Sequence, residues 1–328
     1  MDNTSPHLTW TNVAIGGTFI LFNVIFSTFL GLEKDIPISL SVAAVRCVVQ
    51  LFLLTLILGP VFSGGIWAVA GIAILFNLLG TLEAVLVKSK RRFSYMFPSV
   101  LLSMAGSTIP VSIIGSRFAM SQQPFWTPSN YIPILGMLCG GTISGMVVAL
   151  SSVLKEVVEN KDKVETYLAF GASRFEACKP IATEALRLAL LPTINQMSVI
   201  GLISIPGMMT GALLGGSSLE QAAKLQMIIM FMINASTALA AIVATVLALL
   251  VIVDGEGRLR LDRIDSDEAW LWQVRDRAVG GVVHGVQGAG RKVIGLFRGR
   301  RDEDKQDEDA VDGVPQGQRD GERQPLLG

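Results

Sequence analysis

Two polar residues inside a long apolar run, Arg46 and Gln50, are the first candidates for chemistry. Their spacing of four residues places both side chains on one face of a helix. Ionisable groups are costly at membrane depth and often mark a substrate path. A path or a subunit contact is therefore one interpretation, and an arginine that snorkels to the interface or pairs with Glu83 is the other. The sequence leaves both open.

Sulfur-containing side chains form the second group of candidates. The methionines near two later apolar runs are Met208, Met209, Met227, Met230 and Met232. Thioethers suit soft metals, but methionine also fills irregular apolar gaps, and no histidine or carboxylate lies among these residues. Whether any of them contacts a metal stays unknown from the sequence. The cysteines Cys47, Cys139 and Cys178 are far apart and are expected to be free thiols.

The apolar stretch from Leu186 to Gly216 is interrupted at Pro192 and again at Pro206-Gly207. Proline removes a backbone donor and glycine relaxes the dihedral angles. Freed backbone groups at membrane depth need protein or water as partners, so such a break lines a cavity or an interface, unless it is only a packing kink. We predict a transport pathway lined by Arg46, Gln50, Pro206, Gly207, Met208, Met209 and Gly211.

The composition indicates which elements position these residues. Of 328 residues, 51% are hydrophobic and 16% are charged, and the mean hydropathy is +0.53. These values predict an all-α integral membrane protein. The charges balance to zero and concentrate in loops and in the C-terminal part, so nucleic acid is not an expected partner. The first apolar run lacks a basic segment and a cleavage site, and is expected to be a retained span.

About seven runs are long enough to cross a bilayer. They are Thr11 to Leu32, Ile38 to Gly59, Phe62 to Val85, Tyr95 to Gly115, Asn130 to Val153, Leu188 to Leu214 and Lys224 to Val253. The positive-inside rule predicts an outer N-terminus and a cytosolic C-terminus. Residues 1–10 are expected to form the outer segment, 11–253 the polytopic transmembrane domain, 254–301 a charged and amphipathic cytosolic segment, and 302–328 a disordered tail.

The inward loop, residues 154–187, has an amphipathic helical pattern typical of a helix at a membrane surface. Gly171 is expected to break this helix. A second short helix is predicted from Ser173, an N-cap with Glu176 at the capping-box position, to Lys179 before Pro180. The two helices would form a projecting knob.

This loop resembles the cytoplasmic EAA-type loop of ABC-transporter permeases in the spacing of Glu165, Gly171 and Ile181. Further motifs are similar to those of Fet-type permeases, which are linked to iron export in bacteria, and of the plant aluminium-sensitivity transporters. They are Leu32 to Ile36, Arg46 with Val49 to Leu51, Pro133-Ile134 with Gly136-Met137, Phe170 to Ala172, Arg187 to Thr193, Val199 to Gly211, Gln226, and Met230 to Met232.

The resemblance implies a permease with a separate ATPase subunit, which would carry ATP and Mg, and two permease copies around one pathway. No phosphate-binding loop of the G-x-x-x-x-G-K-[ST] type occurs in this chain, so we expect no bound cofactor and no enzymatic activity of its own. The substrate would be a metal ion such as iron, or a small solute such as the nucleotide-sugar proposed in plants. The residues expected to dock the ATPase are Glu165, Phe170, Gly171, Ala172 and Arg174. An ATPase-independent channel or scaffold is the alternative.

The C-terminal residues Glu322, Leu326 and Leu327 resemble an acidic dileucine sorting signal of eukaryotic membrane proteins. Cytosolic adaptors read such signals, which agrees with the predicted cytosolic C-terminus. The signal indicates a vacuolar or lysosome-like membrane, with the plasma membrane as the other option.

Overall fold

The computed structural model describes the chain except residues 1–8, 31–34, 63, 90, 255–257 and 266–328. The predicted sorting signal at Glu322, Leu326 and Leu327 and the predicted disordered tail lie outside the described residues. So do nearly all of the outer segment and most of the predicted amphipathic segment.

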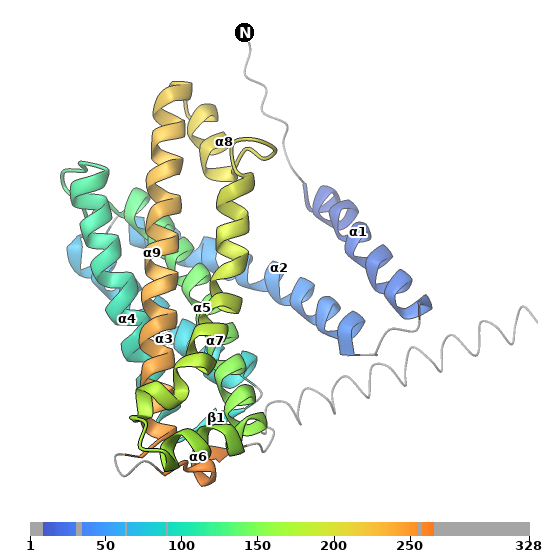
Figure 1. Cartoon of the computed structure of the whole chain (residues 1–328). Coiled ribbons are helices and arrows are strands. Elements are labelled where there is room, and N and C mark those ends of the chain that lie inside the picture. The colour runs from blue at the N-terminus through green and yellow to red at the C-terminus, as the bar shows by residue number, and fades with distance from the viewer. Residues whose placement is uncertain (1–8, 31–34, 63, 90, 255–257, 266–328) are drawn as a thin grey trace, which may run out of the picture. The chain divides into compact units, whose positions relative to one another are not determined.

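Helices dominate the described residues (Figure 1). The α-helices are α1 (Trp10–Phe29), α2 (Asp35–Phe62), α3 (Ile66–Leu82), α4 (Met96–Ile114), α5 (Pro128–Glu159), α6 (Lys161–Ala169), α7 (Arg174–Val199), α8 (Gly207–Leu214) and α9 (Leu219–Ile252). Two wider π-helical turns, η1 (Glu83–Lys88) and η2 (Gly115–Ala119), continue α3 and α4. A 3-10 turn, η3 (Leu261–Arg263), precedes the strand β2 (Ile264–Asp265), which pairs antiparallel with β1 (Arg92–Phe93).

Helices α5 and α9 form the centre of a bundle with α3, α4 and α7. Helix α9 presents Ala240, Ala241, Ala244 and Ala248, all buried, and their small side chains allow neighbouring backbones to approach closely. The partner face on α5 includes Gly145, where an added Cβ would stand 2.4 Å from Thr237 Cγ2. The small residues of α5 therefore serve contact within the chain at this position.

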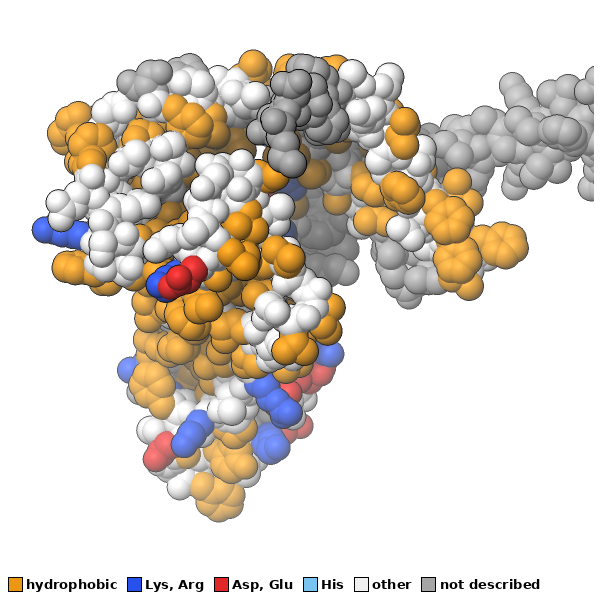
Figure 2. Space-filling model, turned by 90° about the horizontal axis from the view of Figure 1, so that it is seen from above, with side chains coloured by type: hydrophobic (Ala, Val, Ile, Leu, Met, Phe, Trp, Pro, Cys, Tyr) orange, Lys and Arg blue, Asp and Glu red, His pale blue; other side chains and the backbone are white. Residues whose placement is uncertain are grey.

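Helices α1 and α2 form a hairpin that stands apart from the core. They pack against each other, and the rings of Trp10 and Phe52 lie 6.1 Å apart. No described side chain of α1 is buried, and in α2 the buried one is Pro37. Figure 2 shows hydrophobic side chains gathered over this hairpin on the right of the view. Such surfaces suit lipid or a protein partner within the membrane.

The structure confirms an all-α integral membrane protein with several passes. Among the described residues, six helices are long and apolar enough to cross a bilayer: α1, α2, α3 with η1, α4 with η2, α5 and α9. The predicted span Leu188 to Leu214 corresponds to the second half of α7, a turn over residues 200–206, and α8. Seven spans and an outer N-terminus accordingly stay predictions.

Candidate functional site

The predicted knob is built by the end of α5, by α6, and by the first turns of α7. We call these residues, 154–187, the coupling knob. Helix α6 is amphipathic: Val164 is buried against the core, whereas Lys161 and Glu165 are exposed and pair across 3.6 Å. The first part of the loop differs from the prediction, because α5 continues from the bundle to Glu159 before the chain turns at Asn160.

Gly171 ends α6 in the way that the sequence predicts. Its φ of 87° lies in the left-handed region, which glycine adopts without a steric penalty. The Gly171 N–H donates to Leu168 O at 3.0 Å and the Ala172 N–H to Tyr167 O at 3.1 Å, which is the Schellman arrangement. The turn leaves Phe170 with 87% of its surface exposed at the tip of the knob.

The capping box at the start of α7 is also confirmed. The Ser173 N–H donates to Glu176 Oε2 at 2.9 Å, and the Glu176 N–H donates to Ser173 Oγ at 3.4 Å. The Ser173 hydroxyl also donates to the Glu176 carboxylate at 2.7 Å. The hydrogen bonds from Ser173 lower the pKa of Glu176, and the bond from its side chain has a larger effect than the bond from its backbone. Arg174, the first residue of α7, lies 5.8 Å from the Phe175 ring centroid.

The predicted end of the second helix at Lys179 is wrong. Helix α7 runs through Pro180 and Pro192 to Val199. Proline inside a helix costs about 3 kcal/mol, but Ala177, Cys178 and Ile181 are buried in the core around it. Burial of such a set contributes a comparable amount, at about 0.8 kcal/mol per CH₂ group. The α7 part of the knob and the following span are therefore one helix of 26 residues, about 39 Å long at 1.5 Å per residue.

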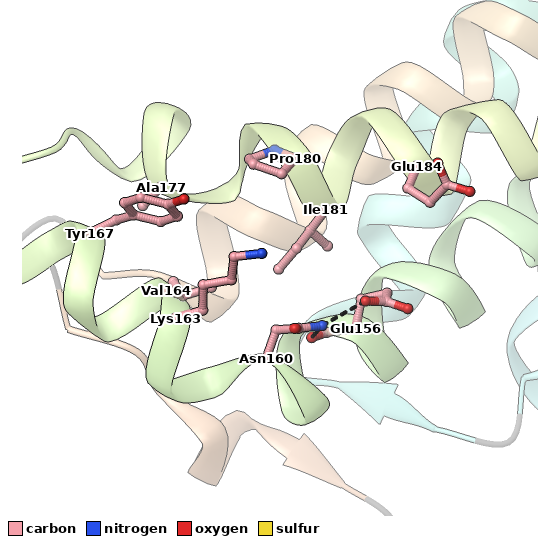
Figure 3. Close-up of a pocket in the computed structure, with 9 residues that line it drawn as sticks. All are labelled: Glu156, Asn160, Lys163, Val164, Tyr167, Ala177, Pro180, Ile181 and Glu184. Atoms are coloured by element: carbon pink, nitrogen blue, oxygen red, sulfur yellow. Dashed lines mark hydrogen bonds between the residues drawn. The ribbon is translucent and has the colours of Figure 1, made fainter.

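A pocket of about 130 Å³ lies inside the coupling knob (Figure 3). Its lining residues come from α5, α6 and α7, and are Glu156, Asn160, Lys163, Val164, Tyr167, Ala177, Pro180, Ile181 and Glu184. The Lys163 amine points into the pocket, and Asn160 Nδ2 donates to Glu156 Oε2 at 2.7 Å. The lining combines charged and apolar side chains, which suits a side chain of a partner. The pocket was not expected from the sequence.

The far end of α7 contains the predicted break. The chain leaves the helix at Ile200, turns at Gly201 with φ of 86°, and enters α8 after Pro206. Within the turn, the Gly201 N–H donates to Ser204 O at 3.1 Å. Leu202 and Ile203 project from it, with 88% and 79% of their surfaces exposed. Glycine and proline thus shape both ends of the turn, as expected from their backbone preferences.

The predicted pathway residues fall on separate elements. Pro206, Met208 and Met209 are half-buried at the start of α8, and Gly207 and Gly211 are exposed there. Arg46 and Gln50 lie on α2 instead. Arg46 Nη1 donates to Glu83 Oε1 at 2.9 Å and its Nη2 contacts Oε2, which is the pairing left open by the sequence. With its amide oxygen turned toward Arg46, Gln50 accepts from Nε at 3.0 Å.

The methionines do not form one cluster. Met230 and Met232 are buried, and Met232 packs with Ile134 and Leu138, whereas Met227 has 56% of its surface exposed. Among the described residues, no group of three His, Cys, Asp or Glu side chains could hold a metal. Packing therefore accounts for Met232, in agreement with the role of methionine as a gap filler.

Buried hydroxyl groups form interhelical hydrogen bonds that sequence reasoning missed. Thr108 Oγ1 donates to Asn77 Oδ1 at 2.8 Å, and the hydroxyls of Ser112 and Tyr131 lie 2.8 Å apart. Asn77 lies on α3 and Thr108 on α4, so the first of these bonds joins two helices. The serines and threonines carry no distinct signal, because such hydroxyls usually bond to the preceding turn of their own helix.

Residues 10–251 match the uncharacterised protein family UPF0014. The chain belongs to this family. The match covers the bundle, the hairpin, the coupling knob and the broken end of α7, and it stops near the end of α9. No solved structure matches the chain.

Three curated relatives show what kinds of protein the chain is similar to. The chain is 32% identical to a UPF0014 membrane protein of Synechocystis, over 61% of this chain and 77% of that protein. It is 26% identical to the probable iron export permease protein FetB of Escherichia coli, over 66% and 80%. It is 29% identical to the protein ALUMINUM SENSITIVE 3 of Arabidopsis thaliana, over 68% and 78%. The predicted resemblance to Fet-type permeases is confirmed.

Proposed function

We propose that this UPF0014 chain is the membrane permease subunit of an ABC-type transporter that exports or compartmentalises a metal ion, such as iron, or a small solute. The observation that carries the proposal is the continuity of α7, which joins an exposed coupling knob to the broken end at residues 200–206. A continuous helix between the two can transmit a displacement of the knob to the break. The name of the FetB relative supports a permease and makes iron the first substrate to test.

In this proposal a separate soluble ATPase binds the knob and carries ATP and Mg. Phe170, exposed at the tip, would enter the ATPase surface, and Gly171 and Ala172 would hold the turn that presents it. Arg174 and Glu165 would provide charged contacts at its sides. Two permease copies would enclose one pathway, with Pro206 to Gly211 among its moving parts.

Co-purification from native membranes tests the partner. The tagged chain is expected to retain a soluble ATPase, and Phe170→Ser is expected to lose it while accumulating to the same level. Leu202→Ser is the matched control, since Leu202 is similarly exposed but lies on the turn at the other end of α7. Absence of any ATPase with the unaltered chain would favour the ATPase-independent channel or scaffold.

Substrate class requires a second measurement in a reconstituted complex. Stimulation of ATP hydrolysis by ferrous or other divalent ions, compared with nucleotide-sugars, separates metal export from solute transport. Stimulation by nucleotide-sugars alone would overturn the metal assignment and keep the permease assignment.

A further inference from the structure

The ion pair between Arg46 and Glu83 joins two parts of the structure that otherwise touch little. Arg46 lies on α2 of the hairpin, and Glu83 lies on η1 at the end of α3 in the bundle. Helix α2 packs mainly against α1 and makes sparse contact with α5. The charged pair is thus the strongest polar link described between the hairpin and the bundle.

The location of this pair makes it costly to break. Both residues belong to candidate membrane spans, and the other acidic residues in the described spans lie within three positions of a span end. Water screens charges poorly at such a depth, so the attraction between the two groups is large, and separating them leaves each charge unpaired. An arginine that merely reached the interface would not need the two-pronged contact that Arg46 makes.

Local backbone geometry presents Glu83 toward the hairpin. It is the first residue of the π-helical turn η1, where α3 widens, and Ser89 Oγ closes that turn by donating to Ala84 O at 2.7 Å. Single π-turns inside helices occur frequently at functional sites. Ala84 and Val85 next to Glu83 are buried, so the carboxylate is anchored on the bundle side of the pair.

The pair is also accessible. Arg46 has 41% of its side-chain surface exposed, and Glu83 has 20% exposed. Gln50 lies beside the guanidinium and can accept from it, which extends the polar contact along α2. Because neither side chain is enclosed by the core, a substitution at either position can remove the contact without disrupting the apolar packing around it.

We propose that Arg46 and Glu83 form a polar clasp that sets the position of the α1–α2 hairpin on the bundle, and that Glu83 is a positioning residue for transport. The clasp itself stands on the geometry alone. The role of Glu83 in transport rests on the proposed function. Loss of either charge releases the hairpin as a unit, because α1 and α2 remain packed on each other. The clasp thus acts through the hairpin and not by contact with the transported species.

Distance measurements between spin labels on the full-length chain in lipid nanodiscs test the clasp. Cys47→Ser removes the exposed native thiol, and the labels are placed at the exposed positions Leu53→Cys on α2 and Leu102→Cys on α4. The unaltered clasp should give one narrow distance distribution. Glu83→Gln and Arg46→Gln should each broaden it at least twofold, and the reversed pair Arg46→Glu with Glu83→Arg should narrow it again.

Lys224→Gln is the matched control. It breaks an exposed ion pair with Glu220 on α9, with a distance of 2.6 Å, and should leave the distribution unchanged. If Glu83→Gln fails to accumulate, Arg46→Lys replaces it, and the loss of the two-pronged contact should broaden the distribution. A narrow distribution in every single variant, or a reversed pair that stays broad, would overturn the clasp.

Transport measurements on the same variants test the positioning role of Glu83. Glu83→Gln should lower the transport rate severalfold while ATPase binding persists, and the reversed pair should recover part of it. Unchanged transport in Glu83→Gln would overturn its positioning role. The distance measurement needs neither an ATPase nor a substrate, so it can fail or succeed independently of the permease assignment.

Discussion

Two glycines of α5 that lie five positions apart have different surroundings. An alanine Cβ at position 145 would meet Thr237 Cγ2 at 2.4 Å, whereas at position 140 nothing lies within 4 Å. We expect Gly145→Ala to lower the stability by about 1–3 kcal/mol, because overpacking forces α5 and α9 apart. Thermal unfolding in detergent measures the effect. Gly140→Ala is the control and should leave the midpoint temperature of thermal unfolding unchanged or slightly raised.

The capping box at Ser173 and Glu176 makes a pH-dependent prediction. The folded state lowers the pKa of Glu176, so the capping contribution is complete above the unfolded pKa, and it is lost as pH falls through the folded pKa in the acid range below about 4.3. The protection factors of the amides in the first turn of α7, which correct for the slower intrinsic exchange at low pH, should therefore fall on acidification. The variant Glu176→Gln should lack this dependence, and an equal acid response in both chains would contradict the assignment.

At the scale of elements, Gly171 sets the angle between α6 and α7. Its positive φ costs an alanine about 1–2 kcal/mol, so Gly171→Ala should weaken the turn and lower ATPase co-purification. Gly171→Asn should be milder, since asparagine tolerates the left-handed region better than alanine does. Equal effects of both variants on co-purification would show that the side chain, and not the backbone conformation, disturbs the knob.

Helix α7 shows where tertiary packing overrides the local backbone preference of a residue. Pro180 would end a short helix by local preference, but burial of Ala177, Cys178 and Ile181 keeps α7 continuous. Gly171 and Ser173 obey local rules because their turn is exposed and no packing competes with it. Sequence reasoning therefore succeeded at the exposed turn of the coupling knob and failed at its buried side.

At the scale of the whole molecule, the coupling knob and the turn at residues 200–206 lie at opposite ends of α7 (Figure 1). The predicted topology places Phe170 in the cytosol and Leu202 within the span Leu188 to Leu214, whose far end faces outward. Because α7 ends at Val199, we expect the turn that carries Leu202 to open toward the outer side. In a Cys47→Ser chain, Phe170→Cys should react with an impermeant thiol reagent from the cytosolic side, and Leu202→Cys from the outer side. The remaining thiols, Cys139 and Cys178, are buried and should stay unlabelled. Labelling of both new cysteines from one side would refute the predicted orientation.

The sequence by itself determined the helical membrane class, the coupling knob with its glycine turn and capping box, and the break after α7. These features follow from apolar run length and from the backbone preferences of glycine, proline and serine, which act locally. Only the tertiary structure decided that Arg46 pairs with Glu83, that α7 is continuous, and that the α1–α2 hairpin stands apart. Those outcomes depend on contacts between residues distant in the chain, where packing and low-dielectric electrostatics outweigh local preference.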